Sequence, residues 1–243
     1  MSETSLPGTV PARVTQLVQR GKSVVANLPV RDVIGSREYS GGGNSTYITM
    51  AEVPQPGEEG DGIVVLELCG GLAPVALALA VNGLKVKRVV YCDTSDEAFL
   101  GAAALHQRAR ELCPQRMPAA MERHVLPQDI TSITAAHLQA AGLHTEQWLL
   151  VAGGWPCPDR SSAGAGAGID GRCAPVGDAV HQIISTLNKL RLGQPHTKQL
   201  WHLVENVAVG KRARAAVLAD QHKRECQFGK PLAVDSAQFD VDR

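Results

Sequence analysis

The sequence lacks a net charge, paired cysteines at metal-binding spacing and any long hydrophobic run. Its 24 Lys and Arg residues balance 24 Asp and Glu residues, so a nucleic-acid-binding face could only be a local basic patch. The six cysteines form no Cys-x-x-Cys pair and no His/Cys cluster, which argues against a metal site. No apolar run reaches the roughly 18 residues of a membrane span, and no signal-like segment opens the chain. We therefore expect reduced thiols, an intracellular location and no membrane contact.

The length and hydrophobic content favour one large core. With 243 residues, of which 44% are hydrophobic, the chain can bury one large α/β core or two small ones, and one core is the simpler expectation. Residues 1–61 are weakly patterned and rich in loop-forming residues, which predicts a weakly structured N-terminal extension. The folded part is expected to begin at residue 62 and to run to residue 243.

Hydrophobic runs with strand and helix periods alternate along this part of the chain. This order predicts an α/β fold with a doubly wound, mostly parallel sheet. The expected strands are 63–68, 86–91, 124–126, 147–156, 200–204 and 231–239, and the expected helices are 72–81, 95–112, 134–141, 176–192 and 211–223.

Candidate chemical groups follow several of these strands. Cys157 stands between Pro156 and Pro158 after a buried run and two glycines, which makes it a candidate nucleophile, although a plain loop cysteine has the same pattern. Ligands of such sheets bind at the C-terminal strand ends. We therefore expect one crevice to be lined by Gly70, Asp93, Asp129, Cys157 and Glu205.

The glycine pair after the first strand has two readings. Two glycines before a helix form either a tight turn or a nucleotide-binding turn, and Asp93, about twenty residues later, is spaced to accept hydrogen bonds from ribose hydroxyls. Basic residues are concentrated in the last quarter of the chain. They form either a nucleic-acid face or a solvated helix face: Lys198, Lys211, Arg212, Arg214, Lys223 and Arg224.

The order of six short stretches resembles the DNA (cytosine-5) methyltransferases, and most closely their eukaryotic de novo type. The stretches are Leu66-Glu-Leu-Cys-Gly-Gly-Leu-Ala, Cys92-Asp-Thr, Gln128-Asp-Ile-Thr, Gly153-Gly-Trp-Pro-Cys-Pro, Leu203-Val-Glu-Asn-Val and Val234-Asp-Ser-Ala-Gln-Phe. The resemblance covers about residues 62 to 243. It implies a Rossmann-like fold that uses S-adenosylmethionine, and a nuclear protein that methylates DNA, with an RNA substrate as a variant.

The resemblance also implies roles for individual residues. Cys157 would add to C6 of a cytosine swung out of the helix, Glu205 would hold the ring at N3 and the exocyclic amine, and Arg243 would begin the family's arginine-bearing motif. No metal is implied. The cofactor-binding residues would be Cys69, Gly70, Gly71, Leu72, Ala73, Pro74, Asp93, Thr94, Asp129, Ile130 and Pro156.

Several positions depart from the family pattern. Cys69 replaces an aromatic residue and Ala73 a glycine, which predicts a weaker stacking surface for the cofactor, and Pro158 replaces Gln or Asn. The family's later motifs would follow Arg243, so the catalytic domain is expected to be partial, unless residues 30–35 and 43–45 supply permuted late motifs.

Three functional classes follow from these patterns. The first is an active cytosine-5 enzyme, and the second is an inactive relative that binds or regulates another methyltransferase subunit. An amino-directed methyltransferase is disfavoured, because no Asp/Asn-Pro-Pro-aromatic stretch is present. Cys173 is the nearest alternative nucleophile.

Overall fold

The computed structural model describes residues 60–156, 158, 167–197, 200–206 and 215–228 of the chain. All of these residues belong to one compact unit. Cys157, Arg243, the strand expected over 231–239 and nearly all of the expected N-terminal extension lie outside the described residues, so these predictions stay predictions.

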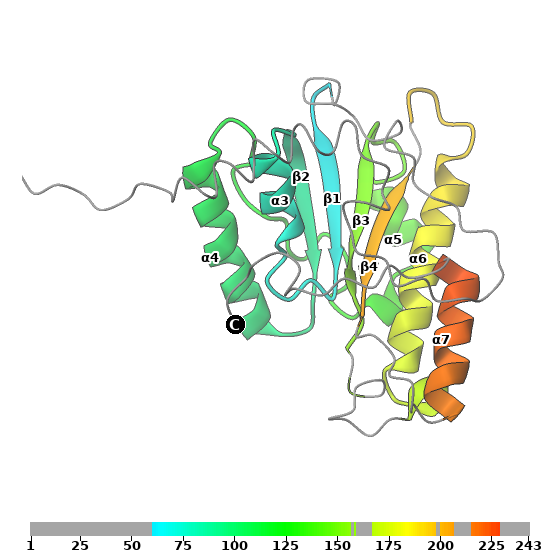
Figure 1. Ribbon diagram of the computed structural model, residues 1–243. Helices are drawn as coiled ribbons and strands as arrows, with labels where there is room; N and C mark the ends of the chain where they lie inside the picture. The colour runs from blue at the N-terminus through cyan, green and yellow to red at the C-terminus, as the bar shows by residue number, and fades with distance from the viewer. Residues whose placement is uncertain (1–59, 157, 159–166, 198–199, 207–214, 229–243) are drawn as a thin grey trace, which may run out of the picture. The chain divides into compact units, whose positions relative to one another are not determined.

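The described part is an α/β fold built on a four-stranded, all-parallel sheet. Its strands are β1 (Ile63–Leu68), β2 (Val86–Cys92), β3 (Leu149–Gly154) and β4 (Trp201–Glu205), in the order β2-β1-β3-β4 (Figure 1). All six residues of β1 are buried, as expected for a central parallel strand. After β1 the chain crosses to β2, which is the neighbour of β1 on one lateral side. After β2 it crosses back to β3, the neighbour of β1 on the other lateral side, so the direction of crossing is reversed at β1 and β3. Ligands of open α/β sheets bind at such a point.

Helices cover both faces of the sheet (Figure 1). On one face, α3 (Val75–Val81) and α4 (Asp96–Leu112) pack with Ile63, Val65 and Val89. On the other, α5 (Ala135–Ala140) and α6 (Ala174–Arg191) pack with Val64, Leu66 and Val151, and α7 (Ala215–Phe228) packs against α6. Short 3-10 helices span Ile130–Ser132 and Gly168–Asp170. These elements confirm the strands and helices predicted within the described residues, with one exception.

The strand predicted over residues 124–126 is wrong. Only Glu122 pairs with the sheet, through an isolated bridge to Val90. His124 has a φ of 69°, a left-handed conformation that ends an extended strand, and Leu126 turns into the core. The apolar pattern of this segment therefore reflects one buried side chain beside the sheet.

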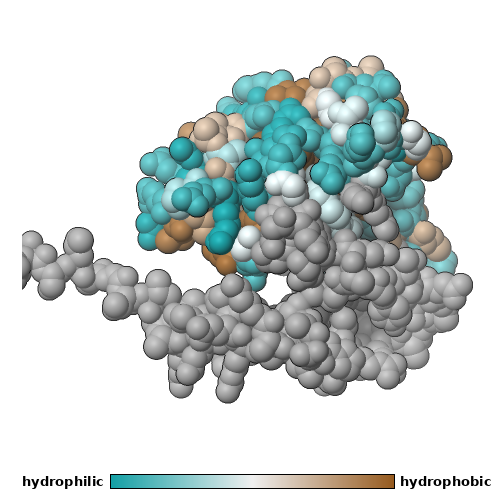
Figure 2. Space-filling view, turned by 90° about the horizontal axis from the view of Figure 1, so that it is seen from above, coloured by the Kyte–Doolittle hydropathy of each residue, from teal (hydrophilic) through white to brown (hydrophobic). Residues whose placement is uncertain are grey.

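The described surface in Figure 2 is mainly hydrophilic, with apolar residues scattered among polar ones. Within the described ranges, no helix has the combination of length and hydrophobicity that a membrane crossing needs.

Candidate functional site

The turn that follows β1 is held against the end of β2. The backbone N–H of Gly71 donates to Asp93 Oδ2 at 3.1 Å, and Tyr91 Oη donates to the carbonyl of Gly71 at 2.8 Å. The second carboxylate oxygen of Asp93 accepts from the Ser95 N–H at 2.9 Å, just before α4. The predicted neighbours Gly70, Gly71 and Asp93 are therefore brought together, and Asp93 fixes the shape of the glycine turn.

The backbone of this turn is strained. Cys69, Gly71 and Ala73 have φ values of 50°, 51° and 49°, in the left-handed region that non-glycine residues seldom adopt. Apart from Gly71 itself and its two chain neighbours, none of the described residues has an atom within 4 Å of the position where a Cβ on Gly71 would stand. The turn therefore has open space above its central glycine, and strained backbone at a ligand site is a common arrangement.

The predicted cofactor-binding residues differ in exposure. Leu72, Pro74, Thr94, Asp129 and Pro156 are exposed. Cys69, Gly70, Gly71 and Asp93 are half-buried around them. The side chains of Ala73 and Ile130 are instead buried in the core, so only their backbone could face a ligand.

Asp129 is fixed by its own turn. Its Oδ1 accepts hydrogen bonds from the backbone N–H of Thr131 at 2.9 Å and from Thr131 Oγ1 at 2.7 Å. These bonds lower the pKa of the Asp129 carboxyl, which keeps it ionised at neutral pH. The charges of Asp129 and Asp93 both help to raise the pKa of Cys69, so both carboxylates lie near this thiol.

The end of β3 fits tightly between β1 and β4 because two residues lack side chains. A Cβ on Gly153 would stand 1.9 Å from the Leu68 carbonyl oxygen, and one on Gly154 would stand 2.3 Å from the carbonyl oxygen of Glu205. The Glu205 Oε2 atom lies 3.2 Å from the same point above Gly154. The predicted carboxylate therefore lies beside the strand end that leads to residue 157.

Trp155, which links β3 to Pro156, is held from several directions. Asn206 Nδ2 donates to its carbonyl oxygen at 3.0 Å. Its ring stacks on Phe228 of α7 with 5.9 Å between ring centroids, and the Arg224 guanidinium lies 5.2 Å from its centroid. These contacts, which the sequence did not reveal, fix the start of the Pro156 segment.

Arg224 itself is buried against α6. Its guanidinium donates to Asp178 Oδ1 at 2.6 Å and to the Ala174 carbonyl at 3.0 Å. Gly177 makes room for it, because a Cβ there would stand 2.8 Å from Arg224 Cζ. Both readings of the basic residues, a nucleic-acid face or a solvated helix face, place Arg224 on the surface, but the structure shows it inside the protein, 4% exposed.

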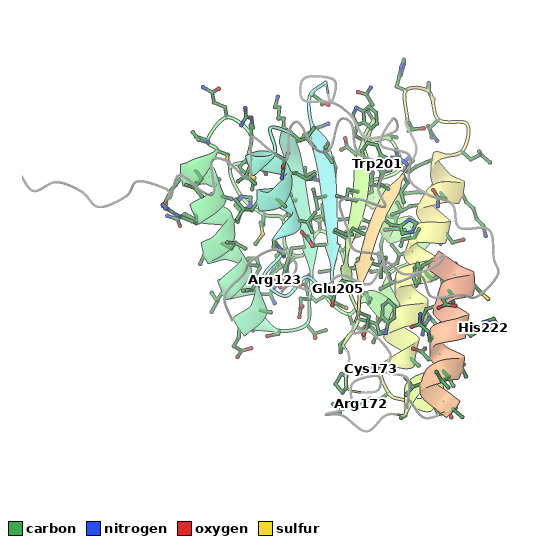
Figure 3. All side chains as sticks on the ribbon, viewed as in Figure 1. Arg123, Arg172, Cys173, Trp201, Glu205 and His222 are labelled. Atoms are coloured by element: carbon green, nitrogen blue, oxygen red, sulfur yellow. The ribbon has the colours of Figure 1, made fainter. Side chains whose placement is uncertain are left out.

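The described thiols near the strand ends are poor nucleophiles. Burial, followed by the charges of Asp93 and Asp129, raises the pKa of Cys69 to about 12, and burial raises that of Cys92 to about 12 as well. Cys173 is buried at the start of α6. Figure 3 shows Cys173 and Glu205 towards the end of the sheet where the strands finish, with Trp201 towards the other end. Cys157 remains the nucleophile that the sequence predicts.

Glu67 lies next to the glycine turn, and sequence reasoning did not identify it. It lies on β1 with 1% exposure, and burial raises the pKa of its carboxyl to about 7. Its sequence signal was an acidic residue between Leu66 and Leu68 in a strand buried on both faces. Such a residue needs a partner or a proton.

Two cavities elsewhere on the surface do not coincide with the strand ends. One of about 220 Å³ lies between α4 and residues 119–121, and one of about 410 Å³ is lined by Lys85 and residues 112–116. We assign the candidate site to the strand ends because the convergent polar groups lie there. The predicted crevice stays a prediction, since most of the residues that follow β3 and β4 (157, 159–166 and 207–214) lie outside the described residues.

Among the described residues, no three His, Cys, Asp or Glu side chains are grouped to hold a metal ion.

Comparison of the chain with models of known protein families finds no match, and no curated protein is significantly similar to it.

Proposed function

We propose that this protein is a Rossmann-like, S-adenosylmethionine-dependent methyltransferase that methylates C5 of cytosine in DNA. The proposal rests on one observation above all: the Asp93-bound glycine turn and Glu205 lie at the same edge of one parallel sheet, beside the strand that leads to Cys157. The resemblance of the short sequence motifs suggested this chemistry, and the arrangement of the described residues supports it.

The residues present fit the cofactor. The open space at Gly71 and the orphaned, buried Oε1 of Glu67 suit a ligand that approaches the backbone closely and carries positive charge. Residues 69–74 would hold its methionine part, Asp93 and Thr94 its ribose, and Asp129 with Ile130 its adenine. When bound, S-adenosylmethionine supplies an electrophilic methyl group.

The chain's own residues would do the rest of the chemistry. Cys157, as thiolate, would add to C6 of the flipped cytosine, which makes C5 nucleophilic. Glu205 would hold N3 and the exocyclic amine and stabilise the ring as its charge changes. After methyl transfer, loss of the C5 proton would release Cys157 from the ring.

A covalent trap tests this proposal. DNA that carries 5-fluorocytosine, incubated with the full chain and S-adenosylmethionine, is expected to form an adduct that survives denaturing electrophoresis, because fluorine cannot leave as a proton does. Cys157→Ala should abolish the adduct, and Glu205→Gln should slow its formation by on the order of a hundredfold. Cys226→Ala, an exposed thiol on α7, is the matched control and should leave adduct formation unchanged.

Two results would overturn the proposal. Absence of an adduct from the wild-type chain, alone and with another methyltransferase subunit, would favour a regulatory or binding role instead. An adduct that survives Cys157→Ala would assign the nucleophile to another thiol, and Cys173→Ala would then be the next variant to measure.

A further inference from the structure

Glu67 lies directly beneath the glycine turn. In the sheet it pairs with Tyr91 of β2 on one side and with Ala152 of β3 on the other. Its Cβ lies 3.1 Å from the point where a Cβ on Gly70 would stand. A charge on Glu67 is therefore separated from the open side of the turn by little more than the backbone of Gly70.

Among the described residues, the carboxyl group of Glu67 lacks a partner for one of its two oxygens. Burial raises its pKa, and the nearby backbone N–H of Val75, the first residue of α3, lowers it by less. Its Oε1 is buried and has no hydrogen-bond partner within the described part of the chain. A buried carboxylate in this position is costly, and a proton or a nearby positive charge would remove the cost.

The elements packed around Glu67 supply no such positive charge within the described residues. Helix α3, with the sequence VALALAV, contains no charged residue. The part of α4 that packs nearby is apolar, at Phe99 and Ala102. Strand β2 adds Tyr91, whose hydroxyl is bonded to Gly71, and Asp93 and Cys69 lie at the strand ends. Arg123 lies over Phe99 and is paired with Asp96.

We propose that Glu67 gives up its proton when a positively charged ligand binds at the glycine turn, so that binding of S-adenosylmethionine releases a proton to the solvent. This inference rests on the proposed function, because it takes the cofactor as the ligand. The O–H bond of the neutral carboxyl breaks, the proton passes to the buffer, and the carboxylate stays in the protein opposite the ammonium and sulfonium groups of the ligand. No electrons are exchanged.

The physical basis is a Coulomb interaction across a short, poorly solvated path. Charges interact several times more strongly inside a protein than in bulk water. Because Glu67 is 1% exposed, the ligand acts on it through the backbone of the turn and not by direct contact. The pKa of Glu67, about 7 in the free protein, falls when the ligand binds, so affinity for the ligand increases as the pH rises from 6 to 8.

Calorimetry of the full chain measures this linkage. At pH 7, the observed heat of S-adenosylmethionine binding should differ between phosphate and Tris buffers by the amount expected for release of about half a proton, since a group with this pKa is half protonated there. Glu67→Gln should still bind the cofactor but without the buffer dependence. Glu111→Gln, an exposed carboxylate on α4, should behave as the wild type.

The outcomes separate this inference from the proposed function. Binding with no buffer dependence, or with the same dependence in Glu67→Gln, overturns the inference alone. Absence of binding in every buffer overturns the cofactor assignment and the inference with it. If Glu67→Gln fails to fold, carbon-13 NMR of the wild type replaces it: one Glu carboxyl should titrate near 7 without ligand and clearly lower with it, and an unchanged titration overturns the inference.

Discussion

At the scale of single residues, the site depends on positions where a side chain is absent. Gly153 combines a φ of 131° with a Cβ position 1.9 Å from the Leu68 carbonyl oxygen. Both features exclude any other residue at this point, because such a φ is strained for L side chains and backbone atoms cannot move aside cheaply. The glycine pair of the Trp-Pro-Cys stretch is thus required by strand packing, whatever the chemistry that follows it.

We expect Gly153→Ala to destabilise the protein by about 3 kcal/mol or more, because it separates β3 from β1. The free energy of unfolding in urea measures this change. Gly101→Ala in α4 is the control: its Cβ would meet only the end of the exposed Leu72 side chain, and helix propensity favours Ala by up to about 1 kcal/mol. Equal stability of the two variants would contradict this account of the strand end.

At the scale of elements, Arg191 joins the end of α6 to the loop before β3. Its guanidinium donates to the carbonyl oxygens of Leu143, Glu146 and Gln147 at 3.2, 2.7 and 3.3 Å. Burial lowers the pKa of Arg191, but an arginine remains charged at neutral pH. The side chain thus satisfies loop carbonyls from inside the protein.

Arg191→Met should cost about 2 to 4 kcal/mol of stability, because it leaves these carbonyl groups without their donor. Unfolding in urea gives the energy, and limited proteolysis should show faster cleavage around residues 143–147. Lys189→Met, an exposed position on the same helix, should change stability by less than about 0.5 kcal/mol. Unchanged cleavage in Arg191→Met would mean that the loop is held by other contacts.

The sequence predicted these elements well where burial alone decides the structure. The runs over 63–68 and 149–154 are apolar because both faces of a central parallel strand are covered. The run over 86–91 belongs to the edge strand β2, where Lys87 is exposed but Val89, Val90 and Tyr91 are buried. The run over 124–126 misled because one buried Leu126 is enough to mimic a short strand. A local pattern cannot separate these two cases.

The candidate site was predictable only in part. Residues at strand ends could be placed on one edge from topology, so the proximity of Asp93 to the glycine turn followed from the sequence. Partners that come from distant segments could not be found in this way. The contacts of Arg224 and Phe228 with Trp155 join residues about seventy positions apart, and no local spacing encodes them.

At the scale of the whole molecule, Glu67 makes the stability of the fold depend on pH. Its pKa is about 7 in the folded protein and 4.5 in an unperturbed chain, so the folded state holds the proton more tightly. Between these values the folded state binds more protons than the unfolded state, and the free energy of unfolding falls as the pH rises. The contribution is complete below pH 4.5 and lost above about 7.

Glu67→Gln cannot ionise and should therefore lose this slope. Relative to the wild type, the variant should gain on the order of 3 kcal/mol as the pH rises from 4 to 8, since one pKa unit corresponds to about 1.4 kcal/mol. Urea unfolding of both proteins across this range, without any ligand, provides the measurement. Parallel profiles would show that Glu67 has the same pKa in both states. Glu111→Gln should run parallel to the wild type.

The three tryptophans of the chain lie in two optically distinct settings. Trp148 and Trp201 stack with their centroids 4.9 Å apart near the beginning of β3 and β4, whereas Trp155 contacts Arg224 and Phe228 near the end of β3. A stacked indole pair couples its electronic transitions, which gives a circular dichroism signal of its own, while a cation beside an indole shifts its emission. The protein therefore carries one spectroscopic reporter at the candidate site and an independent internal reference at the opposite end of the sheet.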